Sequence, residues 1–309
     1  MDLAVANNAF QWVAGWGRLP DSPGTRANGR THGVAVTADG RVVVFRQADP
    51  AVVVLEPDGT PSSTWGDRFA GAHGLTLVEE DGRELLWVTD EHSGEVAKLT
   101  LDGETVLALD PPDLPAYRAG RYAPTWVAVH ERRHGGSGDV WVADGYGMSL
   151  VHRYDADGRY RMSLSGEEGA GRFDCPHAVW VDTRRAEPEL YVADRGNRRL
   201  QVYDLDGTHK RTVGEGVLEC PCTGVRYGDG LVVPELCARL TFLDADDRLV
   251  GYLGRNEAAC ALPGWPEVAP EQIRDGRFNS PHATAADAAG NLYVVEWIVG
   301  GRLTKLSRC

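Results

Sequence analysis

The sequence lacks an excess of basic residues. It contains 32 Lys and Arg against 45 Asp and Glu, which gives a formal net charge of −13 at pH 7. Nucleic acids and anionic membrane surfaces select proteins with clustered Lys and Arg. We therefore expect no nucleic acid and no membrane as a partner, and a small molecule or a short peptide-like substrate fits the composition better.

Long apolar runs are also absent. No segment approaches the ~20 apolar residues that span a bilayer, and the N-terminal residues lack the basic and apolar regions of a secretory signal. We expect a soluble, cytoplasmic, monomeric protein. Cysteine is missing from the first 174 residues, and the six that follow should be mostly thiols in a reducing compartment. Cys220 and Cys222 do not form a CxxC pair, so no zinc knuckle is predicted.

What the sequence does contain is an internal repeat. Six related phrases follow one another, at residues 31–45, 72–90, 124–144, 176–194, 221–235 and 281–297. Each phrase has an apolar strand, a turn rich in Gly or Asp, and a second apolar strand that ends in a polar residue. Third strands, Asp-Gly turns and fourth strands follow them. Four antiparallel strands repeated six times predict an all-β, six-bladed β-propeller that occupies residues 1–309 as a single domain.

The two ends of the chain fit this prediction. Residues 10–17 resemble a fourth strand without the three strands that should precede it, and the last repeat stops at a third strand, residues 302–307. The N-terminal strand is therefore expected to complete the last blade and to close the ring.

Histidine recurs at one position of the repeat. Because the first strand of each blade lines the central channel of a propeller, equivalent residues converge there. The second residues of the six phrases are His32, His73, Thr125, His177, Cys222 and His282. A lone histidine at a strand start is usually a surface or capping residue, but four of the nine histidines at one ring position favour metal binding.

Three of these histidines lie in alternate blades. The spacings are nearly equal, because 177 − 73 is 104 and 282 − 177 is 105. Imidazoles of His73, His177 and His282 can therefore offer three nitrogen ligands to one ion and leave a coordination position open. Three neutral imidazoles suit zinc, copper, iron or manganese, and the spacing does not choose between them. His32 is a candidate fourth metal ligand, a residue that hydrogen-bonds to a metal ligand, or a contact of the substrate. Cys222 is a candidate buried structural thiol, metal ligand or redox group.

The ends of the second strands should lie beside this ring, because the two strands are antiparallel. Residues at those ends include Arg46, Tyr146 and Arg195, together with Glu91 and Glu296, which are candidate contacts of the substrate or of a metal ligand. Arginine can bind a carboxylate through two hydrogen bonds, and tyrosine can transfer a proton. Asp90, Asp144 and Asp194 end their strands identically and are expected to brace turns. The long loop 254–280 is a candidate lid.

Several of these segments together resemble one family of propellers. The segment Asp144-Gly145-Tyr146 with the following strand, and the His-containing phrases at 72–77, 176–181 and 280–294, are similar to NHL-repeat propellers and, within them, to the peptidyl-α-hydroxyglycine α-amidating lyases. The resemblance extends over nearly the whole chain.

The resemblance implies a zinc site formed by His73, His177 and His282, with Tyr146 as the base and an arginine for the substrate carboxylate. The implied reaction divides an N–C(OH) carbinolamide into an amide and glyoxylate. Arg46 is offset by one residue from the family's arginine, which turns its side chain to the other face, so Arg195 is its substitute. Ala283 and Gly147 replace an Asp and a Cys of the family, so neither its structural calcium site nor its disulfide is expected.

The leading hypothesis is therefore a metal-dependent lyase for a carbinolamide-like or α-hydroxy acid substrate that carries a carboxylate, in bacterial-type intracellular biosynthesis. A second hypothesis is another metalloenzyme at the same histidines, such as a hydrolase, isomerase or oxidase. A third is a non-catalytic NHL interaction module, in which the histidines bind no metal. Metal content separates the first two from the third.

Overall fold

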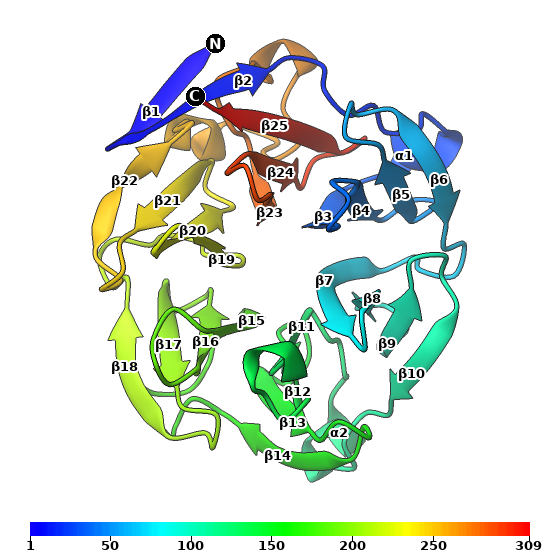
Figure 1. Ribbon diagram of the computed structural model, residues 1–309, viewed down its shortest axis with the longest axis vertical. Coiled ribbons are helices and arrows are strands. Elements are labelled where there is room, and N and C mark those ends of the chain that lie inside the picture. Colours follow the sequence, from blue (N-terminus) through cyan, green and yellow to red (C-terminus); the bar gives the residue numbers. More distant parts are fainter. The chain divides into compact units, whose positions relative to one another are not determined.

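The protein is built from six antiparallel sheets, five with four strands and one with five. A computed structural model describes all residues, Met1–Cys309, and shows this arrangement (Figure 1). The fold is the predicted six-bladed β-propeller. The chain divides into two compact units of three sheets each, residues 69–216 and residues 1–68 with 217–309. The prediction of one domain stays a prediction.

The unit of residues 69–216 contains three consecutive sheets. Their strands are β7 (Ala72–Glu80), β8 (Arg83–Asp90), β9 (Glu95–Thr100) and β10 (Thr105–Leu109); β11 (Trp126–Val129), β12 (Val140–Asp144), β13 (Leu150–Tyr154) and β14 (Tyr160–Leu164); and β15 (Pro176–Asp182), β16 (Glu189–Asp194), β17 (Arg199–Tyr203) and β18 (His209–Val213). Helix α2 (Pro115–Ala119) and the 3-10 helix η1 (Arg132–His134) lie in its loops.

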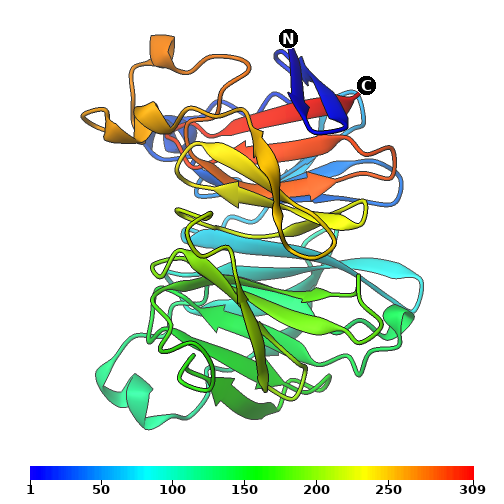
Figure 2. The ribbon, with the colours of Figure 1, turned by 90° about the vertical axis from the view of Figure 1, so that its left-hand side faces the viewer.

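The other unit holds the remaining three sheets. Their strands are β3 (Thr31–Val36), β4 (Val42–Arg46), β5 (Val52–Leu55) and β6 (Pro61–Trp65); β19 (Val225–Tyr227), β20 (Gly230–Glu235), β21 (Arg239–Leu243) and β22 (Leu249–Leu253); and β1 (Asp2–Val5), β2 (Asn8–Val13), β25 (Arg302–Arg308), β24 (Leu292–Glu296) and β23 (Pro281–Ala286). Its short helices are α1 (Pro23–Ala27), η2 (Glu257–Ala261) and η3 (Pro270–Gln272). The loop that carries η2 and η3 projects from the sheets of this unit (Figure 2).

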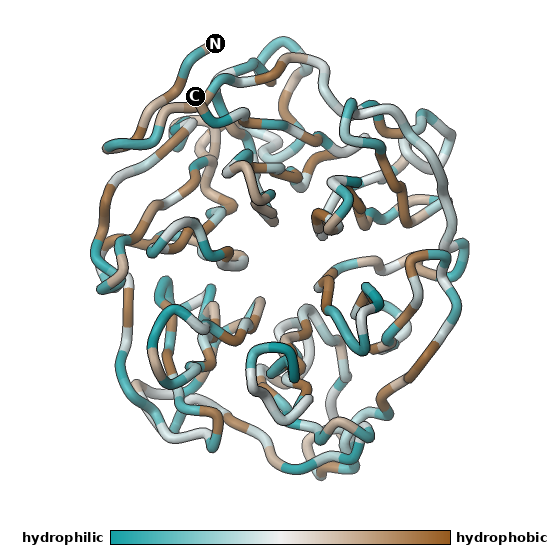
Figure 3. The backbone as a smooth tube through the Cα atoms, in the orientation of Figure 1, coloured by the Kyte–Doolittle hydropathy of each residue, from teal (hydrophilic) through white to brown (hydrophobic).

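Apolar strands alternate with polar turns throughout both units, as the colouring in Figure 3 shows. Four of the turns share one device: an Asp side chain accepts backbone N–H groups from the residues two and four positions later. The four residues are Asp155, Asp204, Asp244 and Asp287. The first three of these Asx turns join strands three and four of their blades in tight hairpins, and the turn at Asp287 joins β23 to β24.

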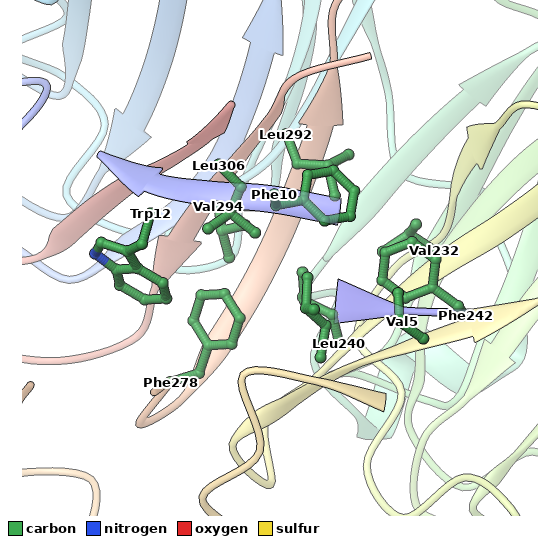
Figure 4. Close-up of a cluster of buried hydrophobic side chains, with 11 residues drawn as sticks. Val5, Phe10, Trp12, Val232, Leu240, Phe242, Phe278, Leu292, Val294 and Leu306 are labelled. Atoms are coloured by element: carbon green, nitrogen blue, oxygen red, sulfur yellow. The ribbon is translucent and has the colours of Figure 1, made fainter. Parts of the chain in front are cut away.

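The N-terminal strand completes the last blade, as predicted. Strand β2 pairs antiparallel with β25, so that Phe10 lies opposite Arg308 and Val13 opposite Lys305. Strand β1 adds a fifth strand that the sequence did not predict. Phe10 and Trp12 pack with side chains of the sheet β19–β22, including Val232 and Phe242, in a continuous apolar cluster (Figure 4).

The first strand of the fifth blade is shorter than its counterparts. Only Val225–Tyr227 forms a strand, and the preceding residues pair with β20 through the isolated bridge Pro221–Glu235. Pro221 has no N–H, and Pro234 on the partner strand has none either, so a continuous ladder cannot form there. None of the short helices has the length or apolar character needed to cross a membrane.

Candidate functional site

The four predicted axial histidines share one local backbone feature. In each case the register of the first strand shifts by one residue where the histidine sits. In the unit of residues 69–216, the shifts fall between Ala72 and Leu75 and between Pro176 and Ala178. In the other unit they fall between Thr31 and Gly33 and between Pro281 and Ala283. A β-bulge directs a side chain away from the regular alternation, so the histidines leave the faces of their sheets.

His73 and His177 form a close pair in the unit of residues 69–216. Both are fully buried, and their ring centroids lie 4.8 Å apart in an edge-to-face arrangement. The Nδ1 atom of His73 is 2.8 Å from the carbonyl oxygen of Thr125. Because a carbonyl only accepts, Nδ1 carries the proton and Nε2 carries the lone pair. This tautomer leaves Nε2 available to bind a metal.

Tyr146 lies beside this pair. Its hydroxyl oxygen is 3.2 Å from Nε2 of His73, and its ring centroid is 5.7 Å from that of His177. Tyr146 is 37% exposed, so its hydroxyl group is within reach of a dissolved substrate.

The two glycines that flank Tyr146 are required by the packing of this turn. A Cβ atom at Gly145 would meet the carbonyl oxygen of Pro176, and one at Gly147 would collide with the carboxylate of Asp144. That carboxylate accepts N–H bonds from Ala123 and Met148, each at 2.7 Å, on the two sides of the segment. These close contacts and hydrogen bonds hold the Asp-Gly-Tyr-Gly segment in one turn conformation.

Arg195 contacts the other side of the tyrosine. Its Nη2 atom donates to the Tyr146 hydroxyl at 3.3 Å, and its guanidinium carbon lies 5.3 Å from the centre of the Tyr146 ring. The same nitrogen is 3.3 Å from Sγ of Cys175. Burial raises the pKa of the Cys175 thiol in spite of the opposing effect of Arg195. A cation, a phenol, a thiol and two imidazoles therefore meet at this point.

His32 and His282 form a second pair, in the other unit. Their ring centroids are 4.7 Å apart, and both side chains are buried. Nδ1 of His282 is 2.8 Å from the carbonyl oxygen of His32, and Nδ1 of His32 is 3.2 Å from that of Arg30. Both imidazoles therefore also carry the proton on Nδ1. Cys222 is buried in the same unit, with Sγ 3.6 Å from the carbonyl oxygen of Cys220.

Comparison with known proteins agrees with this description. No family model matches the chain. Human NHL repeat-containing protein 3 is 29% identical over 307 residues, which cover 93% of this chain and 81% of that protein. A Caenorhabditis elegans protein named probable peptidyl-α-hydroxyglycine α-amidating lyase is 31% identical over 143 residues, 44% of this chain and 37% of that protein.

The chain is a homologue of NHL repeat-containing proteins and of amidating lyases. The match covers 37% of the nematode protein, so it does not by itself assign the activity of that protein to this chain. A streptogramin B lyase structure aligns with a TM-score of 0.62 and 13% identity over 98% of each chain, which supports the fold.

The remaining predicted residues lie in other surroundings. Arg46 is fully buried, and it donates to the carbonyl oxygens of Pro20 and Pro50 and to Oγ1 of Thr25. Glu91 pairs with Arg121 at 2.5 Å and with His92 at 3.0 Å. The roles of Arg46 and Glu91 in a site stay predictions.

An acidic residue ends the second strand of five blades. These residues, Asp90, Asp144, Asp194, Glu235 and Glu296, each accept backbone N–H groups from the loop that leads into the first strand of their own blade. The expectation that Asp90, Asp144 and Asp194 brace turns is confirmed. Arg46 holds the same position in the first blade and donates to its loop instead.

Glu296 belongs to this bracing set and is completely buried. Its carboxylate accepts from the backbone N–H groups of Asn279 and Ser280 and pairs with Arg302 at 3.1 Å. Burial raises the pKa of Glu296, although these partners oppose the rise. Its predicted contact with a substrate or ligand stays a prediction.

Two side chains behind Tyr146 were not predicted. The hydroxyl group of Tyr117 donates to Asp144 at 2.7 Å and lies 2.6 Å from Nε2 of His152, whose Nδ1 is 2.7 Å from Oγ of Ser163. Burial lowers the pKa of His152 to about 3, so its imidazole is neutral. No local sequence signal joins Tyr117 in a loop helix to His152 in a strand, because only the tertiary structure brings them together.

Proposed function

We propose that the protein is a metal-dependent carbon–nitrogen lyase that acts on a carbinolamide-like or α-hydroxy acid substrate with a carboxylate. The observation that supports it most is the position of the Tyr146 hydroxyl, which lies between His73 Nε2 and Arg195 Nη2. The substrate class extends to short peptide-like molecules, and the negative net charge disfavours nucleic acid. The cytoplasmic compartment, the biosynthetic role and the monomeric state stay predictions.

The residues fit a divalent transition metal. His73 presents Nε2 with its lone pair, held by the Thr125 carbonyl, and His177 is its buried neighbour. His282, which has the same tautomer, is the third ligand that the repeat spacing predicts. We propose zinc as the metal, since three neutral imidazoles suit it, and copper, iron and manganese are the alternatives. When bound, the ion would supply Lewis-acid polarisation of the substrate hydroxyl.

Tyr146 and Arg195 would carry out the proton transfer and the binding of the substrate. The positive charge of Arg195 beside the phenol favours the phenolate, which can take the proton of the substrate hydroxyl. The carbon–oxygen double bond of glyoxylate then forms while the C–N bond breaks, and its electron pair goes to the amide nitrogen. Tyr146 returns the proton to that nitrogen. Arg195 has a second set of N–H donors with which it can hold the substrate carboxylate.

The first test is the metal content of the purified protein and its activity. We expect about one zinc, copper, iron or manganese ion per chain, together with glyoxylate release from an N-acyl-α-hydroxyglycine. Metal without activity on this substrate would favour another metalloenzyme. A chain without metal and without activity would favour a non-catalytic NHL module and would overturn the proposal.

The second test compares matched tyrosine variants. Tyr146→Phe removes the proposed base and should lower kcat by about 10²–10⁴-fold while the metal stays bound. Tyr160→Phe is the control, because Tyr160 is equally exposed, at 37%, and lies on the outer strand β14. Equal activity of the two variants would contradict the role of Tyr146.

Arg195→Lys keeps the positive charge but loses the two parallel hydrogen bonds that a guanidinium group donates to a carboxylate. KM should therefore rise by a larger factor than that by which kcat falls.

A further inference from the structure

A cysteine pair lies in the unit of residues 1–68 and 217–309, at the start of the long loop 254–280. We propose that Cys237 and Cys260 are a site of reversible disulfide formation, which fastens this loop to the end of β20. All six cysteines of the protein are thiols in the structure described here. The inference is independent of the proposed lyase activity.

Contacts between neighbouring residues bring the segments that carry the two cysteines together. The N–H group of Asn256 donates to the carbonyl oxygen of Ala238 at 2.9 Å, which ties the start of η2 to the residue after Cys237. Glu257 of η2 reaches Nη1 of Arg239 at 3.5 Å. Residues three apart in a 3-10 helix lie on the same side, so Cys260 faces the same way as Glu257. A side-chain hydrogen bond with Cys237 is the main cause that raises the pKa of the Cys260 thiol, which agrees with this placement.

The chemistry of the pair follows from that hydrogen bond. The hydrogen bond to Cys237, followed by burial, raises the pKa of the Cys260 thiol and so favours its protonated form. In the proposed reaction Cys237 supplies the thiolate that attacks an oxidant. Both side chains are half-buried, which leaves them within reach of a small reagent.

A low-molecular-weight disulfide is the oxidant class that balances this reaction. The Cys237 thiolate attacks one of its sulfurs, the reagent's S–S bond breaks, and one thiol leaves. Cys260 loses its proton and attacks Cys237 Sγ, which forms the protein disulfide and releases the second thiol. The protein loses two electrons and two protons, and the reagent gains them.

The loop fastened in this way ends near the histidine pair of the same unit. Glu267 of the loop pairs with Arg30 at 2.5 Å and accepts the N–H of Val299 at 2.9 Å. The carbonyl oxygen of Arg30 is the one that faces Nδ1 of His32. A covalent link at Cys260 would therefore restrict a loop that is anchored beside His32.

The first experiment identifies the disulfide. The native, fully reduced protein is treated with oxidised glutathione, its remaining thiols are alkylated, and it is digested with trypsin without reduction. We expect peptide 227–239 joined to peptide 256–274, lighter by two hydrogen atoms than the sum of the two. A closed 220–222 disulfide inside peptide 212–226 as the main product, or only glutathione adducts on Cys237 and Cys260, would overturn the proposal.

The second experiment measures the effect on the loop. Oxidation should slow trypsin cleavage of the native protein after Arg274 by about tenfold, because a cross-link limits local opening. Cys260→Ser should abolish this difference, and Cys309→Ser, a change at the exposed C-terminal residue, should preserve it. If Cys260→Ser does not fold, wild-type protein alkylated before oxidation serves in its place. Equal protection of the Cys260→Ser and wild-type proteins would refute the link.

Discussion

At the scale of single residues, the protein holds its polar side chains by burying them among hydrogen-bond partners. His152 is the clearest case, since it lies between Tyr117 and Ser163 with no exposed surface. The neutral imidazole of His152, in this series of hydrogen-bonded side chains, keeps the hydroxyl group of Tyr117 oriented toward Asp144. Asp144 in turn braces the turn that carries Tyr146. The orientation of an exposed tyrosine thus depends on groups that no solvent reaches.

His152 should make stability depend on pH. Its pKa is about 3 in the folded protein and 6.5 in a model peptide, so below pH about 6.5 the unfolded chain binds a proton that the folded chain does not. The free energy of unfolding should therefore fall as the pH falls, by up to about 1.4 kcal/mol per pH unit. The free energy of unfolding of His152→Gln, measured with urea at pH 7.5, 6.5 and 5.5, should fall less with falling pH than that of the wild type. The control His134→Gln, at an exposed residue, should show the same fall as the wild type. An equal fall for His152→Gln and the wild type would contradict the low pKa of His152.

At the scale of elements, strand β2 closes the last blade and also joins it to the preceding sheet. Phe10 is fully buried, and its ring lies 5.9 Å from that of Tyr227 and 6.1 Å from that of Phe242. The N-terminal strand is therefore part of the core of its unit and covers an edge of β25 that would otherwise be open to pairing with another chain.

Phe10→Ala should destabilise the protein by about 3–5 kcal/mol, because it removes a large buried ring and leaves a cavity. Leu249→Ala is the control, since Leu249 lies in β22 of the neighbouring sheet but is 42% exposed, and it should cost less than about 1 kcal/mol. Guanidinium unfolding of the two variants measures the difference. Equal destabilisation would show that β2 is not packed as described.

At the scale of the whole molecule, the proposed ion should link binding to stability. A ligand that binds only the folded state at 100 times its Kd stabilises it by about 2.7 kcal/mol. Removal of the metal with a chelator should therefore lower Tm by about 5 °C or more, and added zinc should restore it. His177→Ala should have a low Tm that does not change when the chelator is added. The Tm of His134→Ala should fall on addition of the chelator as that of the wild type does. An unchanged Tm for the chelated wild-type protein would count against a resident metal.

The sequence by itself determined the repeat and what depends on it. The six phrases, their Asp-containing turns and the incomplete repeats at the two ends predicted the six sheets and the pairing of β2 with β25. Asp90, Asp144 and Asp194 were correctly predicted to brace turns, whereas the same role of Glu235 and Glu296 was found only in the structure. The correct predictions follow from local patterns, because strand alternation and turn chemistry depend on neighbours in the chain.

Only the tertiary structure decided the contacts between segments that are distant in the sequence. The register shifts at His32, His73, His177 and His282 depend on the pairing of two strands, and a one-residue shift changes the direction of a side chain. The hydrogen bonds of Arg46, the contact of Tyr146 with Arg195, and the approach of η2 to the residues after Cys237 likewise join separate segments. No local pattern encodes them, because they arise from long-range packing, and packing is a property of the folded chain.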